Sequence, residues 1–215
     1  MKKTLIDFSQ QTFSNVFNEH TKKLIEREAK HNKWLNSDGS KKKNYYWKYA
    51  SKTKQGDAGE SVVCTTLTLV LKKIYGNGIK CTVVNKGKGE FDLEVYIQSE
   101  NRTITFEVKT ATEDINGSHQ FNGLKKNVNY DFAFLFGVAP ENFFFKIESK
   151  QYLCENMTTN MSKDVEGSYK HTLSQTKLLK YTPQNLYDEL LKKVLCDSNF
   201  GGPSKCISSV STQFR

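Results

Sequence analysis

Two β-rich runs joined by a short polar connection constrain the fold of this 215-residue chain more than any other stretch. In the second run, residues 103–112, polar and apolar side chains alternate, so Glu107 and Lys109 share one face of a strand. The first run, residues 89–97, carries Asp92 and is bounded by polar residues, as strands commonly are. The pattern predicts a β-hairpin that brings Asp92 close to Glu107 and Lys109 at one end of a sheet whose other face is apolar.

The charged side chains of this hairpin suit one kind of chemistry. Two carboxylates held a metal ion's diameter apart, here those of Asp92 and Glu107, provide hard oxygen ligands for Mg²⁺. The backbone carbonyl of Val108 is expected to add an oxygen, and the Lys109 ammonium is expected to orient a water molecule and stabilise charge on a phosphate. Together these groups predict metal-assisted hydrolysis of a phosphodiester bond.

Asp92, followed on the next strand by Glu107-Val108-Lys109, resembles the D…(D/E)-x-K signature of the restriction-endonuclease-like nucleases, the PD-(D/E)xK superfamily. The residue before the aspartate is phenylalanine rather than proline, at a position that binds no ligand. The resemblance extends over residues 55–150. It implies an α/β fold with a restriction-endonuclease-like core, in which a central mixed β-sheet is flanked by helices.

A helix is predicted from Asp57 to about residue 75, before the hairpin, with an apolar stripe that also includes Glu60. Gly56 and Glu60 form a G-x-x-x-E pattern at its head, which resembles the acidic helix motif of the same superfamily, especially of its resolvase-like branch. The resemblance implies that Glu60 is a third acid, which binds the metal directly or through water. The alternative is a first-turn glutamate favoured by the helix dipole.

The E-x-K pattern alone is weakly specific, because the chain contains it three times, at Glu28, Glu107 and Glu148. Glu28 lies in a charged, helix-like stretch with no strand before it. Glu148 follows an apolar run and has Asp131 upstream, so it is a rival for Glu107. The context favours Glu107, which lies in a cleanly alternating run and follows a strand that carries an acid. The remaining alternative is an exposed ion pair across an ordinary hairpin.

The charge of the chain favours a polyanionic partner. The net charge is +9, and residues 1–58 hold thirteen Lys or Arg against six Asp or Glu. We expect double-stranded DNA, although a generally lysine-rich composition would also account for part of the charge. The residues expected to contact DNA lie in a basic and aromatic segment, in the approach to the hairpin and in a loop after it: Lys41, Lys42, Lys43, Lys86, Lys88, His119, Gln120, Asn122 and Lys125. The aromatic residues of the first segment either stack on the nucleic acid or fix the segment to the core.

Five scattered cysteines without a C-x-x-C pair indicate reduced thiols in a cytoplasmic protein. The N-terminus lacks the apolar stretch of a cleaved signal peptide. The longest apolar run, F-A-F-L-F-G-V-A, is far too short to cross a bilayer, so no membrane association is expected.

The chain is expected to form one globular domain with three parts. These are a basic N-terminal helical segment (1–54), the nuclease-like core (55–150) and a C-terminal helical extension with a loosely ordered tail (151–215). Beyond the hairpin, periodicity predicts strands over residues 79–85, 130–138 and 143–149, and helices over 9–35, near 120–128 and over 182–195.

These features predict a Mg²⁺-dependent endodeoxyribonuclease that hydrolyses phosphodiester bonds of double-stranded DNA, most specifically a Type II restriction enzyme. In it Asp92 and Glu107 hold the metal, Glu60 supports it, and Lys109 positions or deprotonates the attacking water. Cutting both strands calls for two active sites, so a homodimer is expected. The alternatives are a structure-selective nuclease such as a Holliday-junction resolvase, and a DNA-binding module that has the fold without the activity.

Overall fold

The structure is a computed structural model of the chain, and it describes residues 22, 32–84, 91–157, 161–164 and 167–195. The strands are β1 (Ile79–Val83), β2 (Leu93–Ile97), β3 (Arg102–Thr112), β4 (Ser118–Leu124), β5 (Phe132–Val138), β6 (Phe143–Ser149), β7 (Ser162–Lys163), β8 (Tyr169–Ser174) and β9 (Leu179–Lys180). The helices and short helical turns are η1 (Asn32–Trp34), α2 (Tyr45–Tyr49), α3 (Lys52–Tyr75), η2 (Gln98–Glu100), α4 (Lys150–Asn156), η4 (Gln175–Lys177), α5 (Pro183–Leu190) and η5 (Leu191–Leu195).

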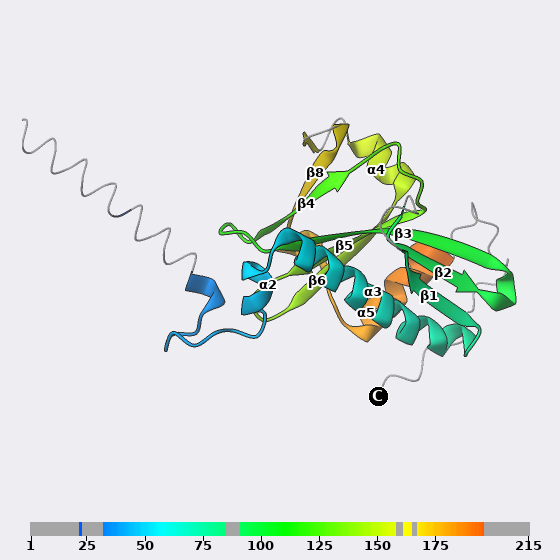
Figure 1. Cartoon of the computed structure of the whole chain (residues 1–215), viewed down its shortest axis with the longest axis horizontal. Helices are drawn as coiled ribbons and strands as arrows, with labels where there is room; N and C mark the ends of the chain where they lie inside the picture. Colours follow the sequence, from blue (N-terminus) through cyan, green and yellow to red (C-terminus); the bar gives the residue numbers. More distant parts are fainter. Residues whose placement is uncertain (1–21, 23–31, 85–90, 158–160, 165–166, 196–215) are drawn as a thin grey trace, which may run out of the picture.

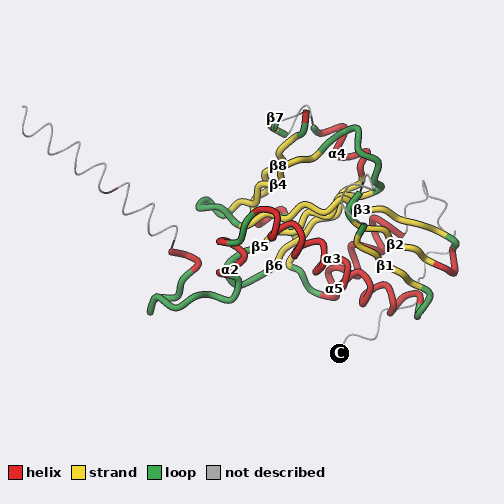
Figure 2. The backbone as a smooth tube through the Cα atoms, viewed as in Figure 1, coloured by secondary structure: helices red, strands yellow, loops and turns green. Residues whose placement is uncertain are grey.

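The strands form two sheets. A six-stranded mixed sheet has the order β1-β2-β3-β5-β6-β9, and a three-stranded antiparallel sheet has the order β4-β8-β7. Helices α3 and α5 pack on one face of the larger sheet, and β4, β8 and α4 pack on the other (Figures 1 and 2). The predicted α/β class, with a central mixed sheet flanked by helices, is confirmed.

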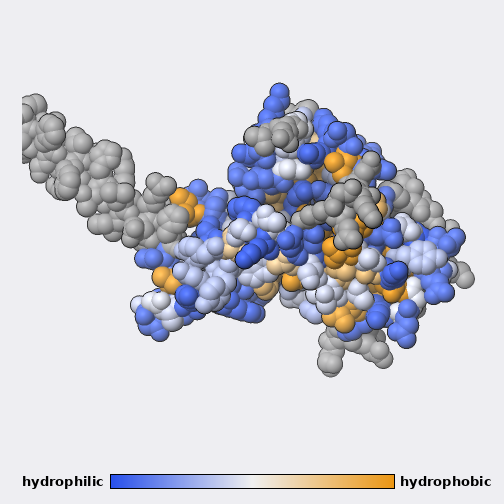
Figure 3. Space-filling model, in the orientation of Figure 1, coloured by the Kyte–Doolittle hydropathy of each residue, from blue (hydrophilic) through white to orange (hydrophobic). Residues whose placement is uncertain are grey.

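Helix α3 is the long helix that precedes the hairpin. It begins at Lys52, earlier than the predicted start at Asp57, because the Ser51 side chain accepts a hydrogen bond from the main chain of Lys54. It ends at Gly76, whose φ of 66° suits glycine. One side of the helix is buried against the sheet, while hydrophobic patches remain visible over its outer side in the space-filling view (Figure 3).

The predicted hairpin is confirmed, since β2 and β3 are antiparallel neighbours with Leu93 opposite Phe106. The connection is the turn η2 followed by Asn101, which has a φ of 46°. Asparagine is one of the few residues that tolerate this left-handed conformation. The register continues the pairing toward Asp92 and Glu107, so the two acids lie at neighbouring positions on adjacent strands.

Strand β5 joins the two layers of the core. All seven of its residues are buried, as the continuous apolar run predicts. Phe132, Phe134 and Phe136 point into the cluster under α3 and α5, whereas Ala133 and Leu135 point into the cluster under β4, β8 and α4. Strand β5 runs parallel to β3, so the chain between them must cross back over the sheet. This crossover contains β4.

The helix predicted near residues 120–128 is wrong, because residues 118–124 form strand β4. His119, Phe121 and Leu124 are buried, while Gln120 and Asn122 are exposed, so the side chains alternate with period two before a bulge. Strand β4 pairs with β8, and the register shifts between Phe121 and Leu124. Gly123, with a φ of 75°, lies in this bulge and allows the shift.

The description of residues 151–215 as a helical extension is also wrong in part. Strands β7, β8 and β9 belong to it, and β9 pairs with β6 at the edge of the larger sheet. The predicted last helix is present as α5, capped by Thr182, and continues into the π-helical turn η5. The helix predicted over residues 9–35 lies outside the described residues, apart from Lys22 and the stretch that contains η1. Within the described chain, no helix combines the length and apolar character needed to span a membrane.

Candidate active site

Strand β3 presents Glu107 and Lys109 on the face opposite Phe106 and Val108, which pack in the core under α3. The two charged side chains form a direct ion pair. Their side chains are only 13% and 22% exposed, so the pair is largely shielded from water. Shielding from water strengthens the attraction between the two charges but also removes part of the hydration of each.

Asp92 is anchored to the same strand from the neighbouring side of the hairpin. Its main-chain N–H donates to the carbonyl of Phe106 at 3.0 Å. Its carboxylate Oδ2 accepts a hydrogen bond of 2.8 Å from the main-chain N–H of Val108. The structure therefore brings Asp92 to the two residues that flank Glu107 in β3.

Three acids act on one another at this point of the sheet. Burial raises the pKa of Glu107 above its ordinary value, and the charges of Asp92 and Glu60 raise it further, while the Lys109 ammonium opposes them. Glu60 lies on α3 and is itself buried. The Glu60, Asp92 and Glu107 side chains thus share one electrostatic environment, which a cation would stabilise.

The close approach of α3 to β3 places Glu60 near the hairpin. A Cβ atom on Gly59 would lie 1.9 Å from Oγ1 of Thr110, a distance that no packing tolerates. Glycine at this position therefore allows the helix to rest directly on β3. The neighbouring Glu60 lies in the same turn of α3 and is buried.

The oxygen donors at the site fit the chemistry of Mg²⁺. No three His, Cys, Asp or Glu side chains among the described residues are grouped so as to hold a metal by themselves. Mg²⁺, however, commonly takes one or two carboxylates and completes its shell with water and phosphate oxygens. The Asp92 and Glu107 carboxylates match that donor set, and burial raises the pKa of Glu107 although the Lys109 ammonium opposes the rise. The main-chain N–H of Val108 bonds Asp92, and the role of its carbonyl stays a prediction.

The rival acids Asp131 and Glu148 have structural partners. Asp131 Oδ2 accepts hydrogen bonds from the main-chain N–H and the hydroxyl of Thr105, at 2.8 and 3.0 Å, and so ties the start of β5 to β3. Glu148 is buried and paired with Lys146 at 2.7 Å and Lys193 at 3.1 Å. These hydrogen bonds and ion pairs give Asp131 and Glu148 a structural role. Glu28, in the remaining E-x-K pattern, lies outside the described residues.

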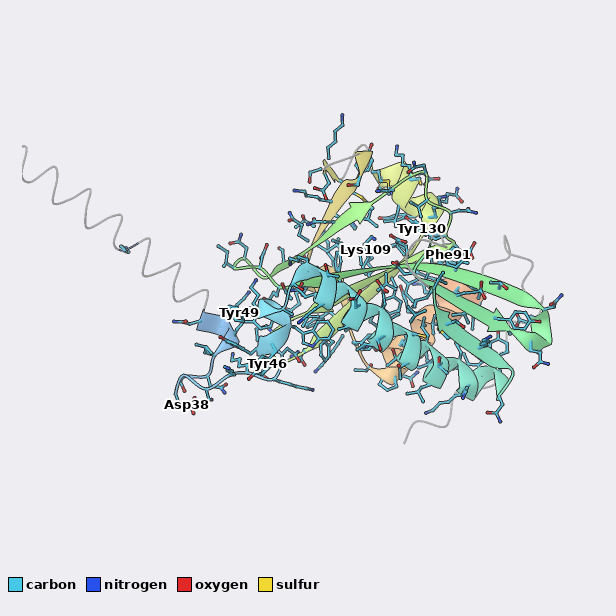
Figure 4. The ribbon with its side chains drawn as sticks, viewed as in Figure 1. Asp38, Tyr46, Tyr49, Phe91, Lys109 and Tyr130 are labelled. Atoms are coloured by element: carbon cyan, nitrogen blue, oxygen red, sulfur yellow. The ribbon has the colours of Figure 1, made fainter. Side chains whose placement is uncertain are left out.

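The basic and aromatic segment before and within α2 is partly anchored and partly exposed (Figure 4). Trp47 packs edge-on against Phe136 and Phe143 and fixes the segment to the core. Tyr46 and Tyr49, in contrast, are 69% and 60% exposed. Of the lysines predicted to contact DNA, Lys41 lies 4.7 Å from the centre of the Tyr46 ring. Exposed lysines and aromatic rings next to one another are the composition of a nucleic-acid contact surface.

Two further lysines of the same segment, Lys42 and Lys43, are half-buried and exposed, respectively. In and after β4, Gln120 and Asn122 are exposed and Lys125 is half-buried, so these side chains remain able to reach a ligand. The other two predicted DNA contacts, Lys86 and Lys88, lie outside the described residues.

The DNA contact predicted for His119 is corrected, because its side chain has no exposed surface. The ring packs against Phe121 and Phe144, and a Cβ atom on Gly137 would lie 2.9 Å from it. Burial lowers the pKa of His119, so the ring is held neutral. The residue is part of the core under the second sheet.

One residue near Glu107 escapes sequence reasoning. Tyr130 lies two residues before the start of β5 and is 4% exposed, and its hydroxyl has no hydrogen-bond partner in the described structure. In the stick view it lies in the same region as Lys109 and Phe91 (Figure 4). The sequence does not single out Tyr130, since a tyrosine at the start of an apolar run is common in a protein core.

Comparison with known proteins gives structural neighbours only. No model of a known protein family matches the chain, and no curated protein matches it. Among solved structures, the chain is similar to the bacterial homing endonuclease I-Ssp6803I, with 15% identity over 63% of this chain and 86% of that one and a TM-score of 0.40. It is also similar to a nuclease from a fusselovirus, with 13% identity over 62% of this chain and 92% of that one and a TM-score of 0.37. Both neighbours are nucleases by description.

Proposed function

We propose that the protein is a Mg²⁺-dependent endodeoxyribonuclease acting on double-stranded DNA, and that it is a sequence-specific Type II restriction enzyme. The observation that carries the proposal is the hydrogen bond from Val108 to Asp92, because it joins the first acid of the signature to the strand that supplies Glu107 and Lys109. The shared electrostatic environment of Asp92, Glu107 and Glu60 supports it further.

Each of the three acids has a proposed role in holding the metal. Asp92 and Glu107 bind it, and Glu60 on α3 supports it directly or through water. When bound, Mg²⁺ neutralises charge on the scissile phosphate and makes water a better nucleophile at neutral pH. The Val108 N–H holds the Asp92 carboxylate in place, so the acid needs little rearrangement before substrate binds.

Lys109 is the residue that acts on the attacking water. In the resting structure its ammonium is paired with Glu107. On substrate binding it turns to the water or to a phosphate oxygen and donates a hydrogen bond there. The water oxygen forms the new bond to phosphorus in line with the P–O3′ bond that breaks, the water releases a proton to solvent, and the leaving 3′-oxygen takes up a proton from solvent. The products are a 5′-phosphate and a 3′-hydroxyl, as the superfamily resemblance implies.

DNA contacts come from two surfaces. Lys41, Lys42 and Lys43 bind phosphates beside the exposed tyrosines of α2, and Gln120 and Asn122 of β4 offer side-chain amides that suit base edges. Cleavage of both strands is proposed to use two copies of the chain. The protein is proposed to act in the cytoplasm, where the Cys64, Cys81 and Cys154 thiols would stay reduced.

Digestion of plasmid and phage DNA with the purified protein in Mg²⁺ tests the proposal. The wild type should produce fixed bands, and Lys109→Ala should cut at least about 100-fold more slowly while still binding DNA in Ca²⁺. Lys150→Ala, in the rival E-x-K pattern, is the matched control and should cut normally. Preferential cutting of four-way junctions would favour a structure-selective nuclease. If no DNA is nicked in Mg²⁺ or Mn²⁺, the chain is a binding module.

A further inference from the structure

The Tyr130 hydroxyl is buried without a hydrogen-bond partner in the described structure. Such a group has lost its hydrogen bonds to water without gaining one in the protein, and this costs free energy of folding. Phenylalanine would fill the same space in the core without this cost. The hydroxyl itself is therefore the feature to explain.

The position of Tyr130 is beside the candidate active site. The ring packs in the hydrophobic cluster that includes Ala111 of β3, and Phe91, the neighbour of Asp92, packs against this cluster. Figure 4 shows Tyr130, Phe91 and Lys109 in one region of the molecule. After burial, the nearby charge of Glu107 is the largest cause that raises the pKa of Tyr130. The phenol is thus protonated and able to donate near that carboxylate at any physiological pH.

In the proposed mechanism, Glu107 loses its hydrogen-bond donor when substrate binds. Its present partner is Lys109, and that ammonium must leave Glu107 in order to reach the water or the phosphate. The Glu107 side chain is only 13% exposed, so solvent cannot fully replace the lost contact. A neutral donor nearby would keep the carboxylate oriented without competing with the metal for charge.

We infer that Tyr130 is a positioning residue for Glu107, which donates its hydroxyl hydrogen to the carboxylate when Lys109 turns to the substrate. This assignment rests on the proposed nuclease function. It explains the unpartnered hydroxyl as a donor whose acceptor is engaged by Lys109 in the resting structure. Hydrogen-bonding partners of a metal-binding carboxylate fix its orientation and typically change metal affinity or activity by about 10- to 100-fold.

The test compares Tyr130→Phe with the wild type in two measurements. Mn²⁺ binding, followed by titration calorimetry with an uncleavable phosphorothioate DNA duplex bound so that Lys109 has turned from Glu107, should weaken by about tenfold or more. DNA cleavage should lose a similar factor in kcat, with KM for DNA unchanged. The melting temperature without metal should stay the same or rise, because the variant removes only an unpaired buried hydroxyl.

Tyr181→Phe is the matched control. Its side chain is partly buried, and its hydroxyl is hydrogen-bonded to Thr66 of α3. This variant should lower the melting temperature and leave Mn²⁺ affinity and kcat unchanged.

The possible failures are distinguishable. If Tyr130→Phe binds Mn²⁺ and cuts DNA like the wild type, the positioning role is overturned and the nuclease proposal stands. A lower melting temperature with normal metal affinity would make Tyr130 a packing residue and overturn the role as well. If the wild type itself neither binds Mn²⁺ nor nicks DNA, the proposed function fails, and the role of Tyr130 fails with it.

Discussion

The carboxylate of Asp92 accepts a 2.8 Å hydrogen bond from the main-chain N–H of Val108, so an acid at the head of one strand is fixed to the middle of the next. The contact has a structural and a chemical side. It satisfies a backbone donor in β3, and it holds one carboxylate beside another that is largely buried. Substitutions of Asp92 should separate the two.

Asp92→Asn keeps an oxygen acceptor for Val108 and removes the charge. We expect it to fold with nearly wild-type stability and to lose at least about 100-fold in cleavage rate, because a metal ligand is lost. Asp92→Ala removes the acceptor as well and should lower the free energy of unfolding by about 1–3 kcal/mol. Urea denaturation and plasmid cleavage measure the two effects. Equal activity of Asp92→Asn and the wild type would remove Asp92 from the site.

Gly59→Ala should destabilise the protein through the contact between α3 and β3. The added Cβ would lie 1.9 Å from Thr110 Oγ1, so Thr110 must rotate or the helix must move away from the strand. Overpacking of this kind typically costs about 1–3 kcal/mol. Gly56→Ala is the control, since a Cβ there meets nothing within 4 Å and a mid-helix Gly→Ala change is favourable. Thermal unfolding of both variants decides the matter; a Gly59→Ala protein as stable as Gly56→Ala would contradict the close packing.

The pH dependence of stability should reveal the burial of Glu107. Its pKa in the folded protein is raised above the ordinary 4.5, chiefly by burial. Its contribution to stability is therefore fully present below the ordinary pKa and is lost as the pH rises through the raised pKa. Glu107→Gln should accordingly be more stable than the wild type at pH 7, with the difference vanishing in acid.

The control for this experiment is Glu148→Gln. Two lysines pair with Glu148, so its substitution should destabilise the protein at pH 7. Denaturation series from pH 4 to pH 8 compare the variants with the wild type. A Glu107→Gln protein that is less stable than wild type at pH 7 would show that the ion pair with Lys109 outweighs burial.

Cys64 of α3 and Cys81 of β1 should form a disulfide on oxidation, because their sulfur atoms lie 3.2 Å apart. A two-electron oxidant such as diamide would take up the two hydrogens that the thiols release. Burial raises the pKa of the Cys81 thiol, so the reaction should speed up as the pH is raised. The crosslink should stabilise the fold by about 3 kcal/mol, as expected for a loop of this length. Mass spectrometry detects it, and Cys64→Ser should prevent it.

Replacing Lys41, Lys42 and Lys43 together by alanine should weaken DNA binding and its salt dependence. Each phosphate contact that is lost should reduce the slope of log K against log salt by about 0.9. Lys72→Ala with Lys80→Ala is a matched control, because both lysines are exposed at the other end of α3 and on β1. Binding curves at several salt concentrations in Ca²⁺ give the slopes. An unchanged slope for the triple variant would place the DNA elsewhere.

Local patterns predicted the elements whose contacts are close in sequence. The hairpin followed from alternation around Glu107, and β5 followed from its continuous apolar run. Strand β4 was missed because its partner, β8, lies far along the chain, with Ser118 opposite Ser174. A short, polar strand with a glycine bulge carries little signal of its own when its stabilising partner is distant.

The candidate site likewise has contacts that local sequence predicts and contacts that depend on distant parts of the chain. Asp92 and Glu107 are separated by one turn of the hairpin, and their proximity could be predicted from register alone. The contact of Gly59 with Thr110 and the position of Tyr130 depend on how α3 and the crossover to β5 pack on β3. Such tertiary contacts leave no periodic pattern in the sequence. His119 was misassigned for a related reason, since its ring is buried by the packing of β4 on β5 and β6 of the larger sheet.

Strand β5 packs Phe132, Phe134, Phe136 and Val138 into one layer and Ala133 and Leu135 into the other, and all seven of its residues are buried. Neither layer is complete without this strand, so neither has a stable existence of its own. The helical side and the small sheet should therefore unfold as one cooperative unit rather than as separable halves. A destabilising substitution under the small sheet should then also destabilise the hairpin that carries Asp92 and Glu107, although the substituted residue does not contact the hairpin.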